Sequence, residues 1–355
     1  MQNIFGYLKK YGDVSFQEKE FNVIDSMVFS CLVYIDFTDL IKSRKENLCF
    51  ALRNLLNVYR CRELIRSKFF SKNIMKLVKE LISLKRFKDV VIYNYEYKLT
   101  DDEQFGALTY KLEDGTVFVG FLGTDDYLVG WKEDFDMFHK FPVPAHKDAI
   151  KYLNKTVGVF DKKVIVGGHS KGGNLALVSS MFANFFVRLK IKKVINLDGP
   201  GLRYKEITSK KYQKTQEKYV LIVPNYSVFG LLLRHSDDYL VVKSNSITFD
   251  SHSPFSWVVD DDKLRFVQLS DFSRKLDESL NMWLNEHDDA TRKYMVDCVF
   301  DAIKKSGVVK TIDIFNVKKF INLIKEVKGL DVGTKNLIMD LLKFNFGYVI
   351  DKKRN

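Results

Sequence analysis

The sequence is poor in residues that cross-link or interrupt a chain. It has four cysteines among 355 residues, too few and too scattered for a disulfide framework, and none has the Cys-x-x-Cys spacing of a zinc site. This usage favours a reducing compartment. Five prolines and the lack of any Gly/Ser-rich stretch leave no recognisable linker between domains.

Long hydrophobic runs are also missing. No stretch of about 18 uncharged apolar residues is present, and residues 1–14 lack the apolar core of a signal peptide. We therefore expect a cytoplasmic protein without a membrane-spanning helix. The content of 46% hydrophobic and 29% charged residues is that of an ordinary globular protein, and the chain is long enough to bury a full core.

Basic residues outnumber acidic ones by 57 to 45, which gives a formal net charge of +12. Most of the excess lies between Lys42 and Lys98, where 15 Lys and Arg face five acidic residues. Within this stretch, Ser71 is predicted to cap a helix with apolar residues on one face and Lys72, Lys76, Lys79 and Arg86 around the other. Such a helix either docks on a core with its charged face in water or contacts anionic lipid or another polyanion. No zinc-finger, helix-turn-helix or RNP-type motif is present, so no specific nucleic-acid binding is expected.

The order of predicted elements indicates an α/β fold. Residues 90–122 contain β-branched and aromatic runs joined by short turns, which predicts neighbouring antiparallel strands. Beyond them, apolar strands alternate with helical stretches, which predicts a sheet that is parallel through its centre. We therefore expect a mostly parallel central sheet in residues 89–260, with helical additions in residues 1–88 and 261–355. Gly307 is predicted to stop one of the C-terminal helices.

The most informative motif is Gly168-His169-Ser170-Lys171-Gly172, which follows an apolar strand and runs straight into a helix. This is the G-x-S-x-G pattern of a nucleophile elbow in the required context. The sharp turn holds the serine in a strained conformation, and the two glycines let neighbouring backbone pass close by. Ser170 also lies at a helix N-terminus, which stabilises negative charge developing beside it.

A serine hydroxyl needs a histidine base that is itself oriented by an acid. His252 follows the last predicted strand and fits the order Ser, acid, His, while His235, which precedes that strand, is the alternative. The other histidines precede the serine, lie inside the elbow or belong to the late helices: His139, His146, His169 and His287.

The candidate acid is Asp198, which ends a predicted strand and is followed by Gly-Pro-Gly. That turn would aim the carboxylate toward the edge of the sheet where active-site groups gather. Asp237, Asp238 and Asp250 are alternatives, and a role for Asp198 as a cap of its own turn is the other reading.

Two groups are candidates for binding the oxyanion of an acyl-transfer reaction. One is the backbone N–H of Lys171, directly after the nucleophile. The other is Thr124, whose N–H and hydroxyl lie in a turn after an earlier predicted strand. The Lys171 side chain either covers the helix surface or attracts an anionic head group.

These motifs resemble those of the class-three (fungal-type) lipases, which have an α/β-hydrolase fold. FLGTD at residues 121–125 is similar to their oxyanion-strand motif, Gly130-Trp131 with Asp134 to their Trp-x-x-Asp element, and residues 167–176 to their elbow. The chain is still more similar to a bacterial family of lipase-like proteins of unknown function, and the resemblance covers roughly residues 1–260. The motifs of that family recur in this order: SFQEKEFNVIDSMVFSCLVY, GTDDYLVGWKEDF, GGHSKGGNLA, LDGPG and HSPFSW.

The resemblance implies a serine esterase or lipase-like hydrolase with Ser170 as nucleophile, His252 as base, and Thr124 and Lys171 at the oxyanion hole. It calls for no metal or organic cofactor. Two positions depart from the lipase pattern. Leu122 stands where those lipases usually carry Arg, and residues 225–227 offer no carboxylate where their acid usually follows a strand. The acid has therefore moved to Asp198 or is missing.

Two hypotheses from different classes follow. The first is a serine hydrolase that cleaves small-molecule or lipid esters through a Ser170-Asp198-His252 triad and an acyl-enzyme. Its basic N-terminal helices would act as a cap or as an interface to an anionic membrane surface. The second is a catalytically weak or inactive hydrolase-like scaffold that binds anionic lipid or another polyanion through those helices. The sequence specifies neither the acyl chain nor the oligomeric state.

Overall fold

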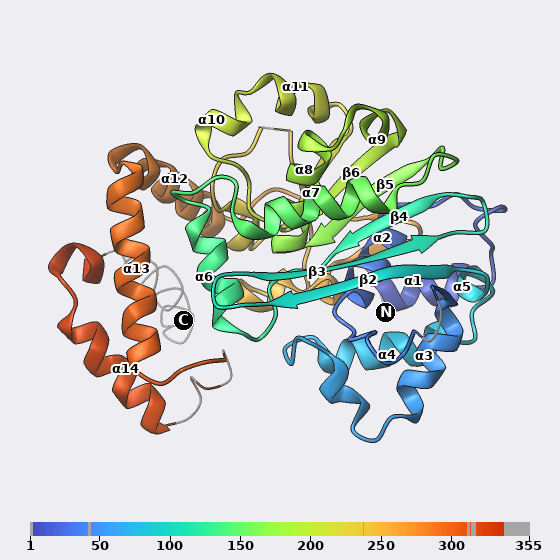
Figure 1. Ribbon diagram of the computed structural model, residues 1–355, viewed down its shortest axis with the longest axis horizontal. Coiled ribbons are helices and arrows are strands. Elements are labelled where there is room, and N and C mark those ends of the chain that lie inside the picture. The colour runs from blue at the N-terminus through green and yellow to red at the C-terminus, as the bar shows by residue number, and fades with distance from the viewer. Residues whose placement is uncertain (1–2, 42–43, 237, 311–312, 314–316, 337–355) are drawn as a thin grey trace.

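The computed structural model describes residues 3–41, 44–236, 238–310, 313 and 317–336 (Figure 1). At its centre lies an eight-stranded sheet whose strands follow one another in chain order. Its strands are β1 (Lys45–Asn47), β2 (Val91–Leu99), β3 (Gln104–Lys111), β4 (Val117–Phe121), β5 (Val164–His169), β6 (Ile191–Leu197), β7 (Tyr219–Pro224) and β8 (Leu240–Val242). Neighbouring strands are antiparallel from β1 to β4 and parallel from β4 to β8. The predicted α/β fold with a mostly parallel sheet centre is confirmed.

The helices of the described residues precede, interleave with and follow these strands. The N-terminal ones are α1 (Ile4–Tyr11), α2 (Val23–Leu32), α3 (Leu48–Asn57), α4 (Ser71–Leu81) and α5 (Lys85–Lys88). Those between strands are α6 (Leu128–Asp136), α7 (Pro144–Thr156), α8 (Lys171–Phe182), α9 (Phe185–Lys190), α10 (Tyr204–Ile207) and α11 (Lys210–Gln216). The last are α12 (Asp271–Glu286), α13 (Asp289–Lys305) and α14 (Val317–Gly329). Short 3-10 turns and a small hairpin complete the list: η1 (Cys61–Leu64), η2 (Phe229–Leu231), η3 (Thr248–His252), η4 (Pro254–Ser256), β9 (Val259–Asp260) and β10 (Lys263–Leu264).

Helices α7, α8 and α11 cover one face of the sheet. Parallel strands that advance in one direction through right-handed crossovers place their connecting helices on the same side. Val166 of β5 and Val194 of β6 point to this face and pack in one buried cluster with Ala149 of α7 and Leu175 of α8. This packing fixes α8, and with it the elbow at its N-terminus, against the sheet.

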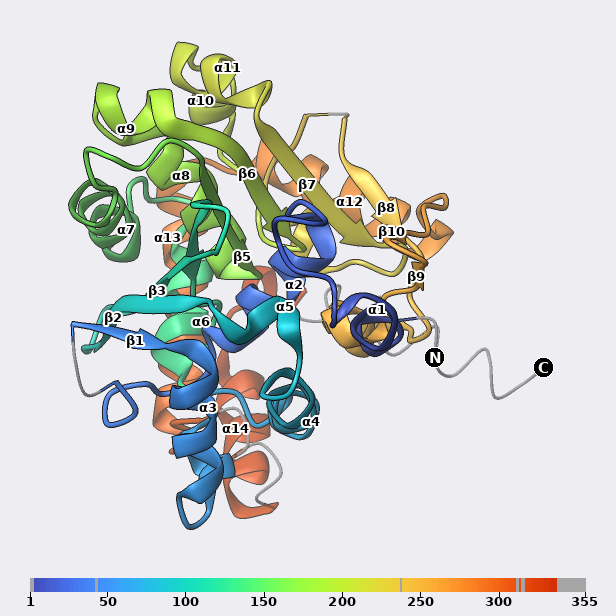
Figure 2. The same ribbon diagram turned by 90° about the vertical axis from the view of Figure 1, so that its right-hand side faces the viewer.

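The N-terminal helices cover the opposite face (Figure 2). Because side chains alternate along a strand, Phe118 of β4 and Ile165 of β5 point away from α8 and join a second buried cluster. That cluster also holds Phe29 of α2, Leu8 of α1 and Ile74 of α4. The N-terminal residues therefore supply the second helical layer of the fold.

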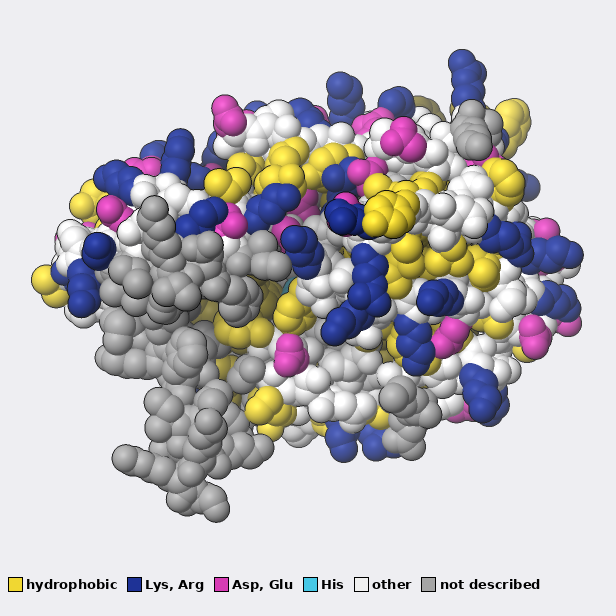
Figure 3. Space-filling model, turned by 90° about the horizontal axis from the view of Figure 1, so that it is seen from below, with side chains coloured by type: hydrophobic (Ala, Val, Ile, Leu, Met, Phe, Trp, Pro, Cys, Tyr) yellow, Lys and Arg dark blue, Asp and Glu magenta, His cyan; other side chains and the backbone are white. Residues whose placement is uncertain are grey.

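Helix α4 has the predicted amphipathic pattern, but its predicted cap is wrong. Phe70 occupies the N-cap position, and Ser71 is the first helical residue, whose hydroxyl donates to the Lys68 carbonyl at 2.9 Å. The apolar side of α4 is buried in the core, while Lys72 and Lys79 are exposed. Lys and Arg side chains are spread widely over the face of the molecule that includes these helices (Figure 3). The helix thus docks on a core with its basic side in water.

The C-terminal helices pack beside α6. Leu284 of α12 joins Met137, Phe138, Val143 and Leu233 in a separate buried cluster. The predicted helix stop at Gly307 is confirmed, since this glycine follows α13 with a φ of +82°. Residues 337–355 of the predicted C-terminal extension lie outside the described residues.

No helix within the described ranges combines the length and the apolar character that a bilayer crossing requires.

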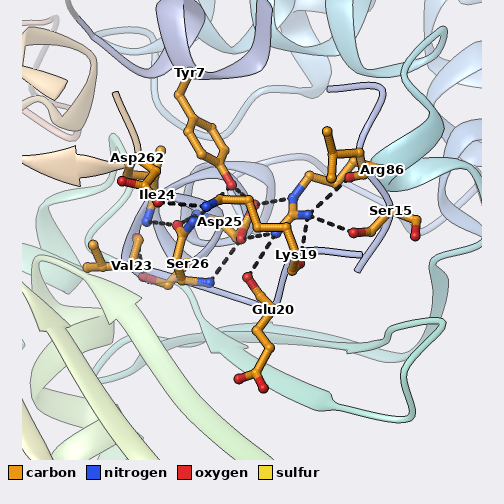
Figure 4. Close-up of polar contacts among 12 residues, drawn as sticks. Tyr7, Ser15, Lys19, Glu20, Val23, Ile24, Asp25, Ser26, Arg86 and Asp262 are labelled. Carbon is orange, nitrogen blue, oxygen red and sulfur yellow. Dashed lines mark hydrogen bonds and ion pairs between the residues drawn. The ribbon is translucent and has the colours of Figure 1, made fainter. Parts of the chain in front are cut away.

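Beneath the N-terminal helices, Asp25 and Arg86 form an ion pair whose side chains are fully buried (Figure 4).

Candidate active site

Ser170 lies in the turn between β5 and α8, with φ 58° and ψ −134°. Non-glycine residues rarely adopt this conformation, and it is the strained geometry of a nucleophile elbow. A Cβ on Gly172 would lie 2.2 Å from the Phe121 carbonyl oxygen, and one on Gly168 would lie 2.4 Å from the Gly172 carbonyl. Both positions therefore require glycine, and the turn has the strand-turn-helix form that the sequence predicts.

The structure brings His252 and Asp198 together. His252, at the end of η3, places its Nδ1 atom 2.6 Å from Oδ2 of Asp198. Asp198 directly follows β6, at the same sheet edge as Ser170, and its side chain is fully buried. Its other oxygen accepts hydrogen bonds from the Ser227 hydroxyl at 2.5 Å and from the Gly230 N–H at 3.1 Å. The carboxylate is thus held in one orientation against the imidazole.

Burial affects the protonation of both partners. Desolvation raises the pKa of Asp198, while the hydrogen bonds from Ser227 and Gly230 act to lower it. Desolvation also lowers the pKa of His252 below that of a free histidine. A neutral imidazole whose Nδ1–H points at Asp198 leaves the Nε2 lone pair available to accept a proton.

His169, the residue before the nucleophile, connects the elbow to the His252 loop. Its Nε2–H donates to the His252 carbonyl oxygen at 2.8 Å, and its Nδ1 accepts from the Tyr34 hydroxyl at 3.1 Å. The two imidazole rings lie 4.3 Å apart between centroids. His169 and Tyr34 therefore tie the loop that carries His252 to the elbow. Sequence reasoning missed both roles, although a histidine next to the candidate nucleophile was a visible signal.

A second set of polar contacts fixes the loop after Asp198. Asn174 of α8 donates to the carbonyl oxygens of Pro200 at 3.2 Å and Gly201 at 2.7 Å. Its own amide oxygen lies 2.6 Å from Nε2 of His146. A Cβ on Gly199 would lie 2.1 Å from the Ser170 carbonyl oxygen, so this loop packs directly on the elbow.

The alternative site residues lie elsewhere. The His235 ring packs beside Gly201, and in the described part of the chain its buried Nε2 has no hydrogen-bond partner. Asp238 and Asp250 are exposed, and Asp237 lies outside the described residues. The histidine and acid that the sequence favours are the pair that the structure joins.

Both candidate oxyanion-hole residues lie beside the serine. Lys171 is the first residue of α8, where a helix N–H has no partner within the helix. A Cβ on Gly123 would lie 2.6 Å from the His169 carbonyl oxygen, so the turn that carries Thr124 passes close to the elbow. The Thr124 hydroxyl donates to Asp134, so the Thr124 main-chain N–H, and not its hydroxyl, remains the candidate for the second donor.

The Lys171 side chain does not reach the site, so of its two predicted roles the structure excludes the attraction of an anionic head group. Its ammonium group is fully buried and donates to the Gln104 carbonyl at 2.7 Å and to the Glu133 carboxylate at 3.0 Å. Glu133 also accepts from the Ala145 N–H at 2.8 Å. The side chain ties the start of α8 to α6 and β3, which is a structural role.

Aromatic side chains lie over the base. The Phe229 ring is 4.5 Å from the His252 ring between centroids, and Trp131 and Phe249 pack on Phe229 at 5.6 and 5.7 Å. These rings form an apolar surface next to His252, the candidate base. Among the described residues, no three or more His, Cys, Asp or Glu side chains are grouped to hold a metal ion.

Asp134 is expected to make stability depend on pH. Its burial raises its pKa to about 7, although Lys171 and the Thr124 hydrogen bond act to lower it. The unfolded chain loses this proton near pH 4, so between about pH 4 and 7 only the folded state keeps it, and stability falls as the pH rises. From pH 5 to pH 8 the wild type should lose roughly 2 kcal/mol more free energy of unfolding than Asp134→Asn.

Urea unfolding of both proteins at the two pH values measures this difference. Asp39→Asn makes the same charge change at an exposed position and should keep the wild-type pH dependence. An unchanged pH dependence in Asp134→Asn would show that the carboxyl is ionised throughout.

Comparison with known proteins gives a family and a distant structural likeness. The structure described as "Crystal structure of M37 lipase" is similar at 16% sequence identity and a TM-score of 0.37, covering 59% of this chain and 69% of that chain. No curated protein matches this sequence. The model of the Mbeg1-like family matches residues 81–301, a stretch that contains Ser170, Asp198 and His252. This chain therefore belongs to the Mbeg1-like family.

Proposed function

We propose that this protein is a serine hydrolase of the lipase/esterase type that cleaves carboxylic esters of small molecules or lipids. The observation that carries the proposal is the 2.6 Å contact between Nδ1 of His252 and the buried Asp198 carboxylate. An imidazole oriented in this way at the edge of a sheet that also presents a strained serine is what nucleophilic acyl transfer requires. The family membership and the motif resemblance support the same function.

Acylation begins with attack of the Ser170 hydroxyl oxygen on the ester carbonyl carbon. Nε2 of His252 accepts the hydroxyl proton, and Asp198 stabilises the imidazolium that results. The oxyanion of the tetrahedral intermediate accepts hydrogen bonds from the N–H groups of Lys171 and Thr124. The ester C–O bond then breaks, and the leaving alcohol takes the proton from His252.

Deacylation repeats these steps with water as the nucleophile. His252 accepts a proton from the water as its oxygen attacks the acyl-enzyme carbonyl. The second intermediate collapses, Ser170 regains its proton from His252, and the carboxylic acid leaves. The aromatic surface formed by Trp131, Phe229 and Phe249 favours esters with an apolar acyl or alcohol part.

Covalent labelling tests whether the serine is activated. Incubation of the full chain with a fluorophosphonate, followed by intact-mass measurement, is expected to give a single adduct. Ser170→Ala and His252→Ala should abolish the adduct, because one removes the nucleophile and the other its base. Ser83→Ala, which removes an exposed serine, should label like the wild type.

The absence of an adduct would contradict the proposal if it held at every pH between about 6 and 9, a range in which His252 is neutral because burial lowers its pKa. In that case the protein would be a hydrolase-like scaffold. An adduct that survives in Ser170→Ala would place the reactive group at another residue.

A further inference from the structure

Large apolar side chains are exposed at the end of the sheet opposite Ser170. They come from the loop between α7 and β5 and from the short helix α9. Phe160 is 93% exposed and Phe186 is 74% exposed, values unusual for phenylalanine in a folded protein. The amino-end patch, as we call it, consists of Val159, Phe160, Phe185, Phe186 and Leu189.

The two segments of this patch form one surface. The Lys190 ammonium, at the end of α9, donates to the carbonyl oxygens of Gly158 at 2.5 Å and Val159 at 2.8 Å. At the start of α9, the Asn184 N–H donates to the Asn154 side chain of α7 at 2.8 Å. Figure 2 shows α7 and α9 close together on one side of the molecule. A contiguous apolar surface of this kind usually marks a binding site.

Basic residues line a pocket next to the patch. The pocket, of about 210 Å³, lies between α8, α9 and α11, and Phe185 and Leu189 of the patch form part of its wall. Its charged lining residues are all cationic: Arg188, Lys211, Lys214 and Lys218. Within the described ranges, no ion pair joins any of these four to a carboxylate. The Lys211 ammonium lies 3.9 Å from the centre of the Phe182 ring, and the Lys218 ammonium donates to the Arg188 carbonyl oxygen at 3.3 Å. Their positive charge is therefore available to an anion.

The exposed aromatic residues and the cations without a carboxylate partner together favour an anionic lipid surface as the partner. Phenylalanine and leucine side chains enter the boundary between head groups and acyl chains, while Lys and Arg attract anionic lipids. A second copy of this chain would bring like charges together around the patch, which opposes self-association. Helix α4 differs, because its own apolar face is already buried in the core.

We propose that the amino-end patch docks the protein onto an anionic phospholipid bilayer, with a lipid phosphate in the pocket lined by Arg188, Lys211, Lys214 and Lys218. This docking does not depend on the proposed hydrolysis. The patch precedes β5 and β6, whereas Ser170 follows the six residues of β5, a length of about 20 Å. The docked protein would hold the candidate active site away from the bilayer and open to water.

Vesicle co-sedimentation of the full chain tests this docking. Binding to vesicles of phosphatidylcholine with about 30% phosphatidylglycerol should exceed binding to pure phosphatidylcholine, and should weaken at high salt. Phe160→Ser/Phe186→Ser should reduce the affinity at least about tenfold, because the inserted apolar surface is lost. Lys211→Glu/Lys214→Glu should abolish the preference for anionic vesicles.

The matched control is Lys72→Glu/Lys79→Glu on α4, which makes the same charge change on a basic face without exposed apolar residues of its own. It should change the affinity by less than about threefold. Ser170→Ala should bind like the wild type, and the patch variants should keep the wild-type rate on a water-soluble ester. These controls separate a failure of docking from a failure of the proposed hydrolysis.

Three results would overturn the proposal. The first is equal binding of the wild type to neutral and anionic vesicles. The second is an α4 control that weakens binding as much as the pocket variant, which would show attraction by overall charge. The third is a dimer in sedimentation velocity that the phenylalanine replacements dissociate, which would assign the patch to a second copy of this chain.

Discussion

Asp198→Asn is expected to lower kcat for ester hydrolysis by about 10,000-fold. The Asp198 carboxylate accepts the Nδ1–H of His252 at 2.6 Å, and this contact keeps Nε2 unprotonated, as a base for Ser170 requires. An asparagine amide in the same place can donate to Nδ1, which favours the wrong tautomer, and it carries no charge to stabilise the imidazolium. The hydrogen bonds from Ser227 and Gly230 go to the other oxygen, so the loop can keep its shape around asparagine.

Steady-state kinetics on a short-chain aryl ester measure the effect, with thermal unfolding as a check on the fold. Asp250→Asn is the matched control, because it changes another candidate acid that is exposed and lies in the same 3-10 turn as His252. It should leave kcat close to the wild-type value. A large loss in Asp250→Asn together with normal activity in Asp198→Asn would reassign the acid.

The features that the sequence predicts well are those encoded by neighbouring residues. The elbow needs glycines two positions either side of Ser170, and the steric contacts of Gly168 and Gly172 show why. The parallel strands are recognisable because each is a short apolar run that ends in a turn. Asp198 could be selected for the same reason, since the end of a parallel strand places a residue at the active edge.

Contacts between distant segments could not be predicted in this way. Tyr34 lies on the far layer of the fold, yet its hydroxyl bonds His169, because α2 packs against β5. Lys171 directly follows the candidate nucleophile in the sequence. Only the fold shows that its ammonium group forms an ion pair with the carboxylate of Glu133, 38 positions earlier. No local pattern distinguishes a lysine that is buried in an ion pair from one in solvent.

A buried ion pair beneath the N-terminal helices could not be predicted from the sequence either. The basic stretch from Lys42 to Lys98 is dominated by charges that a sequence reading places on solvated faces. One of these charges, Arg86, is instead 2% exposed and lies beneath α1 and α2. Its partner Asp25 is 61 positions earlier, in a helix start that looks like an ordinary capping box with Asn22.

Arg86→Leu is expected to reduce the free energy of unfolding by about 3 to 5 kcal/mol. The guanidinium forms two bonds with the Asp25 carboxylate, at 2.8 Å from Nε and 2.6 Å from Nη2, and both side chains are fully buried (Figure 4). It also donates to four main-chain carbonyl oxygens of the segment between α1 and α2, those of Val14, Ser15, Lys19 and Glu20. Leucine would leave a buried carboxylate without its countercharge and these carbonyls without a donor.

Urea unfolding followed by far-UV circular dichroism measures the loss, and two further variants identify its cause. Arg53→Leu is the control, because that arginine is exposed and donates to a single carbonyl, that of Ile82, at 2.7 Å; it should cost less than about 1 kcal/mol. Asp25→Asn/Arg86→Leu removes the buried charge, and the single amide oxygen of asparagine can still accept one of the two hydrogen bonds that the separate Asp25 oxygens accept from the Tyr7 hydroxyl and the Asn22 N–H. The double variant should therefore be more stable than Arg86→Leu alone, because an unpaired buried charge costs more than unpaired carbonyls. If the double variant were instead as unstable as the single one, the carbonyl contacts rather than the ion pair would be what Arg86 contributes to the fold.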